Sequence, residues 1–151
     1  MKRRIHAIAG MIGFFTILTF WTTTVISELF GSYVTIAGVK QMILYGMMLL
    51  VPALMVTGGS GMSLGAKRKD PKTLAKKKRM PFIAANGLLI LVPSAVFLAT
   101  KSAAGSFDGW FYSVQALELV AGATNLTLIG LNIRDGLTMT GRIGRKKKVA
   151  R

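Results

Sequence analysis

The chain has 151 residues, a formal net charge of +15, 52% hydrophobic residues and a mean hydropathy of +0.51. A soluble domain rarely combines such values, whereas a membrane protein does so when its charges are confined to loops and tails. The chain has no cysteine, which excludes disulfides, thiolate metal sites and cysteine nucleophiles.

Four apolar runs follow one another along the chain, each close to the roughly 20 residues that a helix needs to cross a bilayer. They predict helices at about residues 5–27, 34–56, 81–99 and 110–133, followed by a basic tail at residues 134–151. The first run exceeds the apolar core of a signal peptide, which is about 7–15 residues. We therefore expect it to be retained as a membrane helix.

A basic segment, residues 67–79, separates the second run from the third and is predicted to be a loop. It holds eight Lys and Arg residues, the N-terminus three and the tail seven, so 18 of the 20 fall on one side of the predicted helices. The positive-inside rule then predicts that both termini are cytoplasmic. Short connections favour antiparallel neighbours. The expected fold is an all-α, multi-pass, four-helix up-down bundle in the bacterial inner membrane.

The basic residues flank apolar spans and do not decorate a folded face, so nucleic acid is not an expected partner. Anionic lipid head groups are the expected partner instead.

Two local features refine the helix ends. Residues 58–65 (GGSGMSLG) are predicted to form a flexible exit from the second helix. Pro81 is predicted to occupy the first turn of the third helix, where its missing N–H costs nothing.

Polar residues recur every seven positions along the fourth run, at Glu118, Asn125 and Asn132, with Gln115 three residues before Glu118. This spacing places them on one helix face, which we expect to point into the bundle because exposure of polar groups to lipid is costly. Two interpretations stay open. The stripe holds the helices together by hydrogen bonds, or it lines a path for protons or ions.

Lys40 in the second run and Glu118 in the fourth lie at a similar depth, roughly 9–12 Å below the outer ends of their helices at 1.5 Å per residue. Similar depth and opposite charge predict an ion pair. Glu28 is the competing partner for Lys40, and outward extension of Lys40 alone is the other alternative.

His6 is the sole histidine, and Gly10 and Gly13 follow it on the same helix face. An imidazole can ligate haem iron, and glycines let a flat macrocycle approach the backbone. The pattern of Ile5, His6, Gly10 and the threonines at 22–24 resembles the first helix of PepSY-type membrane proteins and, more loosely, of b-type membrane cytochromes. The resemblance covers about 20 residues and implies b-type haem on His6, although those proteins supply further histidines that this chain lacks.

A haem on His6 leaves three arrangements open: five-coordination, a methionine as second ligand, or two chains that each donate His6 across a homodimer. The methionines in reach are Met55, Met80 and Met139. A backbone carbonyl, Asn86 or Asn132 would fix the imidazole tautomer. The alternative is an interfacial histidine that bonds to Asn86, Asn132 or water.

The whole chain resembles the small four-helix proteins of bacterial inner membranes, on the runs KKRMPFIAANGLLILVPSAVF and VQALELVAGATNLTLIGLNIRDGL. Three functions remain: a b-type haem protein for electron transfer or haem handling, a non-catalytic accessory or assembly subunit of a larger membrane complex, and a small transporter that uses Lys40 and Glu118. No Ser-His-Asp set, catalytic carboxylate pair or metal cluster can be assembled from one histidine and five acids, so enzymatic activity is not expected.

Overall fold

The computed structural model describes residues 1–143, so residues 144–151 of the predicted tail lie outside the described part. The described chain is helical almost throughout. Its elements are α1 (Lys2–Phe30), α2 (Tyr33–Gly65), α3 (Pro71–Asn86), one π-helical turn η1 (Gly87–Leu91), α4 (Val92–Ala103) and α5 (Gly109–Met139).

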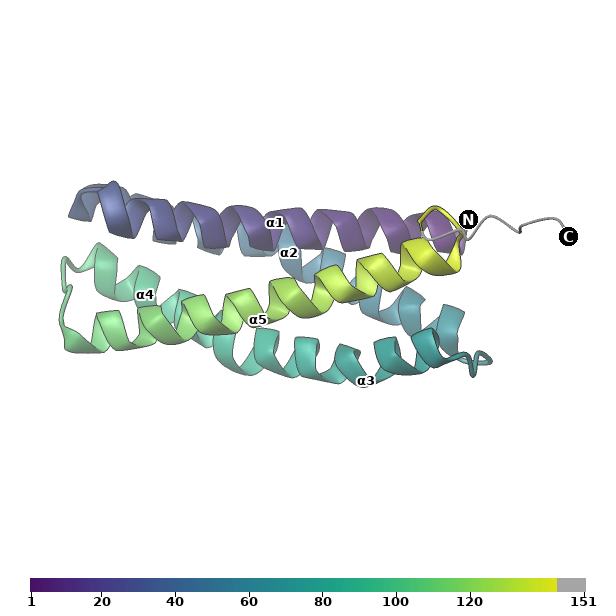
Figure 1. Cartoon of the computed structure of the whole chain (residues 1–151). Coiled ribbons are helices and arrows are strands. Elements are labelled where there is room, and N and C mark those ends of the chain that lie inside the picture. The colour runs from purple at the N-terminus through teal and green to yellow at the C-terminus, as the bar shows by residue number, and fades with distance from the viewer. Residues whose placement is uncertain (144–151) are drawn as a thin grey trace, which may run out of the picture.

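The elements form an all-α four-helix bundle in which α3, η1 and α4 make up one long helical segment (Figure 1). The start of α1, the α2–α3 connection and the end of α5 lie at one end, on the right in Figure 1. We call this the basic end, and we call the opposite end, with the α1–α2 and α4–α5 connections, the far end. The four segments are long and apolar enough to cross a membrane, which confirms the prediction of four membrane-length helices.

Every helix extends beyond its predicted bounds. The apolar runs measure only the thickness of a hydrocarbon core, whereas the backbone hydrogen-bond ladder continues into the polar flanks until a capping residue ends it. Ser32 caps α2 by accepting a hydrogen bond from the Thr35 N–H at 3.2 Å, and Asp108 caps α5 by accepting one from the Phe111 N–H at 3.0 Å. These two caps set the register of the helices that carry Lys40 and Glu118.

The basic segment is not the loop that was predicted. Only residues 66–70 connect α2 to α3, and most of the segment is the first part of α3. Asp70 begins this helix by accepting a hydrogen bond from the Thr73 N–H at 3.0 Å, and Pro71 follows it. Pro81 therefore lies inside α3 and not in its first turn, and the predicted tail likewise begins as helix, because α5 continues to Met139.

Residues 58–65, predicted to be flexible, form the last part of α2. Their small side chains let neighbouring helices come close. A Cβ atom added to Gly61 would lie 3.0 Å from Cε1 of His6, and one added to Gly65 would lie 3.3 Å from Cε of Lys77. The glycines serve as packing surface for α1 and α3.

The turn η1 has a local cause. Pro93 has no N–H to donate to the Leu89 carbonyl, so the hydrogen-bond ladder is interrupted there. The preceding residue, Val92, donates instead to the Gly87 carbonyl five residues earlier. Asn86 and Gly87, a typical turn pair in soluble proteins, are helical here as expected, with φ −62° at Gly87.

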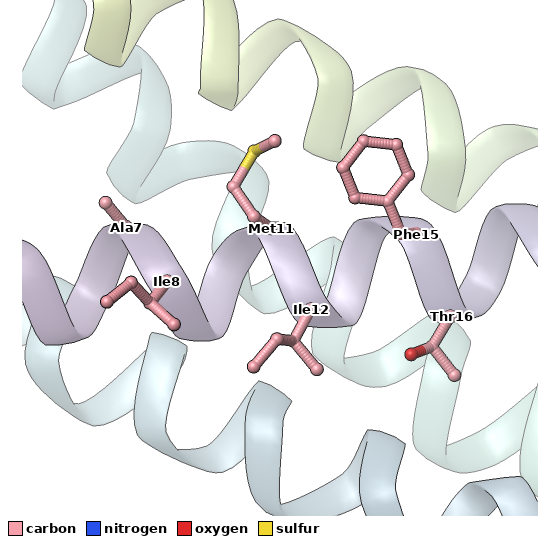
Figure 2. Close-up of a pocket in the computed structure, with 6 residues that line it drawn as sticks. All are labelled: Ala7, Ile8, Met11, Ile12, Phe15 and Thr16. Carbon is pink, nitrogen blue, oxygen red and sulfur yellow. The ribbon is translucent and has the colours of Figure 1, made fainter.

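Two apolar clusters form the core. One, at Ile17, Ile83 and Ile129, joins α1, α3 and α5, and the other, at Ile36, Leu98 and Phe111, closes the far end. The outer surface is also strongly apolar. Figure 2 shows a groove on α1 whose lining is almost entirely apolar; it consists of Ala7, Ile8, Met11, Ile12, Phe15 and Thr16. Such a face fits hydrocarbon chains and carries no reactive group.

Candidate functional site

A buried ion pair joins α2 and α5 in the far half of the bundle. Lys40 Nζ lies 2.7 Å from Glu118 Oε2, and the two side chains are 0% and 12% exposed. Lys40 lies two turns into α2 and Glu118 lies a similar distance into α5, so the two charges come to the same level. A charge buried in this way costs free energy unless a partner compensates it.

Two further polar side chains surround this pair. Gln115 is 4% exposed and donates from Nε2 to Glu118 Oε2 at 3.2 Å. Glu28, near the end of α1, interacts electrostatically with both Lys40 and Glu118. We call Glu28, Lys40, Gln115 and Glu118 the far-end cluster.

Two oxygen atoms of the far-end cluster are buried without a hydrogen-bond partner among the described residues: Glu28 Oε1 and Gln115 Oε1. Buried polar atoms are nearly always satisfied, so an orphaned pair of acceptors calls for an explanation such as a bound ion, water or proton. With both carboxyls ionised the far-end cluster carries a net charge of −1. One cation or proton would neutralise it.

A cavity of about 370 Å³ lies beside Glu28. It is lined by Glu28, Gly31, Ser32, Tyr33, Ile36 and Tyr112. The lining includes hydroxyl groups as well as the carboxyl group, so water can enter from the far end. The cavity therefore reaches the far-end cluster at Glu28.

Asp108, another acidic residue at the far end, already has hydrogen-bond partners. Lys101 donates to Asp108, which also caps α5. The Lys101 ammonium and the Phe111 N–H lower the pKa of the Asp108 carboxyl from its ordinary value. Asp108 is thus an ionised, satisfied carboxylate outside the far-end cluster and provides a matched control.

The polar stripe of α5 faces neighbouring helices along its length. Asn125 is 1% exposed, and its Oδ1 accepts a hydrogen bond from Asn86 Nδ2 at 2.9 Å. Asn86 Nδ2 also donates to the Ala121 carbonyl at 2.8 Å. The two asparagines join the third helical segment to α5 midway along the bundle.

The stripe ends in a second ion pair at the basic end. Arg79 donates to Asp135 Oδ2 at 2.6 Å and to Asn132 Oδ1 at 3.2 Å. The sequence pattern does not reveal Arg79 and Asp135, because it predicts a loop at residues 67–79 and a tail from residue 134. One signal was available: Asp135 follows Asn132 by three residues, as Glu118 follows Gln115.

His6 bonds to neither Asn86 nor Asn132, which corrects one expectation. Its Nδ1 lies 3.1 Å from the Thr57 carbonyl and 3.0 Å from Ser60 Oγ, both on α2. The Thr57 carbonyl agrees with the expectation of a backbone carbonyl beside the ring, whereas Ser60 was not expected because residues 58–65 are predicted to form a flexible exit from the second helix.

The face of α1 that follows His6 does not fit a haem. A Cβ atom on Gly10 would lie 3.6 Å from Cγ2 of Thr57, and one on Gly13 would lie 3.0 Å from Cδ2 of Leu54. Side chains of α2 therefore fill the space that a flat macrocycle would need. In residues 1–143 no group of three or more His, Asp or Glu side chains is arranged to hold a metal ion.

Comparison of the chain with protein-family models, characterised proteins and solved structures finds no match. Neither sequence resemblance is thus supported by a family match, and the functional argument rests on the geometry of the chain itself.

Proposed function

We propose that this chain is an integral membrane protein that moves protons across the bilayer, with the far-end cluster as its proton-binding site. The observation that carries the proposal is the buried Lys40–Glu118 pair with the unpartnered Glu28 Oε1 atom beside it. Ionisable groups inside a membrane span are costly and are usually retained for transport or proton relay.

The charge balance favours a proton as the occupant. Lys40 and Glu118 neutralise one another, which leaves Glu28 as the carboxyl without a compensating charge at a partly buried position. A proton on this carboxyl removes the charge and turns one oxygen into a donor, for which the orphaned Gln115 Oε1 is an acceptor of the same cluster.

The remaining polar groups supply a route. Protons would enter through the cavity at Glu28, pass the Lys40–Glu118 pair, and continue along the α5 stripe to Arg79 and Asp135. The steps between Glu118, Asn125 and Asn132 are each about 10 Å along the helix at 1.5 Å per residue. Water must therefore bridge them during transport.

In the membrane, the basic end faces the cytoplasm and both termini lie there. The 18-to-2 distribution of Lys and Arg in the sequence supports this orientation in a bacterial inner membrane. Reporter fusions after Met139 and within residues 104–108 test it. A cytoplasmic signal from residues 104–108 would overturn the orientation.

Proton flux into proteoliposomes tests the function. With the purified full chain reconstituted and a membrane potential imposed, we expect acidification of the lumen faster than in protein-free vesicles. Glu28→Gln and Glu118→Gln should reduce the flux to the protein-free level, because each removes one carboxyl of the far-end cluster.

Asp108→Asn is the matched control. It also removes a carboxyl at the far end, but asparagine is an equally good helix cap, so flux should equal that of the wild type. Wild-type flux no faster than that of empty vesicles, or full flux in both glutamine variants, contradicts the proposal.

An accessory-subunit role is the second candidate. The observation in its favour is that Asn86 and Asn125 bond to each other and to backbone carbonyls of the partner helix, as groups that only hold helices together would do. This role predicts no proton flux and co-purification with a larger membrane complex.

A further inference from the structure

A second charged cluster lies at the basic end of the bundle, where Asp135 is about 25 Å along α5 from Glu118 at 1.5 Å per residue. Three cationic side chains converge there on one carboxylate. Arg79 NH1 lies 2.6 Å from Asp135 Oδ2 and Arg134 NH2 lies 3.5 Å from Asp135 Oδ1. Each oxygen of the Asp135 carboxylate therefore has an arginine partner.

Lys76 is the third cation. Its side chain, half-buried, packs against α5, where Nζ lies 3.2 Å from the position of a Cβ atom on Gly136. It interacts electrostatically with Asp135 and with Arg79, but no carboxylate lies within 4 Å of its Nζ in the part of the chain that the structure describes. Lys76, Arg79 and Arg134 against Asp135 leave a net charge of +2.

The position of this cluster along the helices indicates which ligand it binds. On α3 the apolar part of the span begins just after Arg79, at Met80, and on α5 it ends just before Arg134, at Ile133. The cations therefore lie where apolar surface gives way to polar surface, the level of lipid phosphates. Phe82, one turn beyond Arg79, is 70% exposed and offers apolar surface for an acyl chain beside the charges.

We infer that the cluster of Lys76, Arg79, Arg134 and Asp135 attracts an anionic phospholipid and binds its phosphate through Lys76. The phosphate lies against the Lys76 ammonium, which lacks a carboxylate partner, while the two guanidinium groups remain bonded to Asp135 and add long-range attraction. The net charge of +2 favours a lipid that carries a net negative charge over a zwitterionic one. Arg79 and Asp135 also lie at the end of the proposed proton route, but Lys76 does not belong to that route, so loss of lipid binding in a Lys76 variant can be distinguished from loss of proton flux.

Native mass spectrometry of the delipidated full chain in detergent tests this inference, with phosphatidylglycerol and phosphatidylcholine of identical acyl chains as probes. We expect preferential retention of phosphatidylglycerol. Lys76→Gln should weaken that retention about fivefold, the effect of roughly 1 kcal/mol per basic residue near a lipid head group, whereas Lys76→Arg should retain it.

Lys72→Gln is the matched control, since it changes the net charge equally at an exposed position one turn away on α3. It should weaken lipid retention clearly less than Lys76→Gln does, and thermal unfolding should show that all three variants remain folded. Equal loss in Lys72→Gln and Lys76→Gln, equal binding of the two lipids, or displacement of phosphatidylglycerol by the same concentration of inorganic phosphate would each overturn the lipid assignment.

Discussion

Replacing Lys40 with methionine should lower the free energy of unfolding by roughly 3–5 kcal/mol, the usual cost of breaking a buried ion pair from one side. The reason is that Glu118 would be left buried without its ammonium partner, held only by Gln115. Reversible unfolding of the detergent-solubilised chain measures the change.

The double variant Lys40→Met/Glu118→Leu is the informative control, because it removes both charges and leaves apolar side chains of similar size. It should recover most of the lost stability. Lys101→Met removes a partly exposed cation at the same end and should cost far less. A Lys40→Met variant as stable as the wild type, or a double variant less stable than Lys40→Met, contradicts the assignment of a mutually compensating pair.

Gly46→Ala should destabilise the bundle by about 1–3 kcal/mol, the usual cost of overpacking. A Cβ atom at Gly46 would overlap Cζ of the Phe20 ring and would lie 2.6 Å from its Cε1, so α1 and α2 would have to separate or the ring would have to leave its rotamer. The loss should appear in the same unfolding assay.

Gly38→Ala is the matched control on the same helix. No atom lies within 4 Å of its added Cβ, so the variant should be neutral or gain about 0.4–1 kcal/mol from reduced flexibility of the unfolded chain. The double variant Gly46→Ala/Phe20→Leu should regain part of the loss. Equal effects at Gly38 and Gly46 would contradict the close α1–α2 contact.

The bundle was predictable because four apolar runs and a one-sided distribution of charge leave few other folds. The helix ends were not, since Asp70 caps a helix inside the segment read as a loop and Pro81 lies within that same helix. A hydropathy pattern reports where hydrocarbon can cover a helix; it does not report where backbone hydrogen bonding stops.

The Lys40–Glu118 ion pair was predictable from the depth of the two residues in their helices. Counting residues from each helix start brought the two charges to one level, where the structure places them 2.7 Å apart. The orphaned oxygens of Glu28 and Gln115 had no signal in the sequence, because satisfaction of a buried atom depends on how three helices pack around it.

The face of α1 that carries His6, Gly10 and Gly13 was predictable only in part. Glycines at i+4 and i+7 indicate where a helix permits close approach, but the spacing does not say what approaches. Here α2 does, through Thr57 and Leu54. A backbone carbonyl was among the partners expected for His6, and the structure places that of Thr57 there; the Ser60 hydroxyl beside it was not expected.

We expect the far-end cluster to hold an exchangeable proton, and infrared difference spectroscopy of its carboxyl groups in H₂O and D₂O tests this most directly. We expect the wild type at neutral pH to show the C=O stretch of a protonated carboxyl that shifts on exchange into D₂O. The band should be lost in Glu28→Gln and in Glu118→Gln, where Lys40 is left with one carboxylate to neutralise, and retained in Asp108→Asn. Absence of a protonated carboxyl band in the wild type, or its persistence in Glu28→Gln, would contradict the claim.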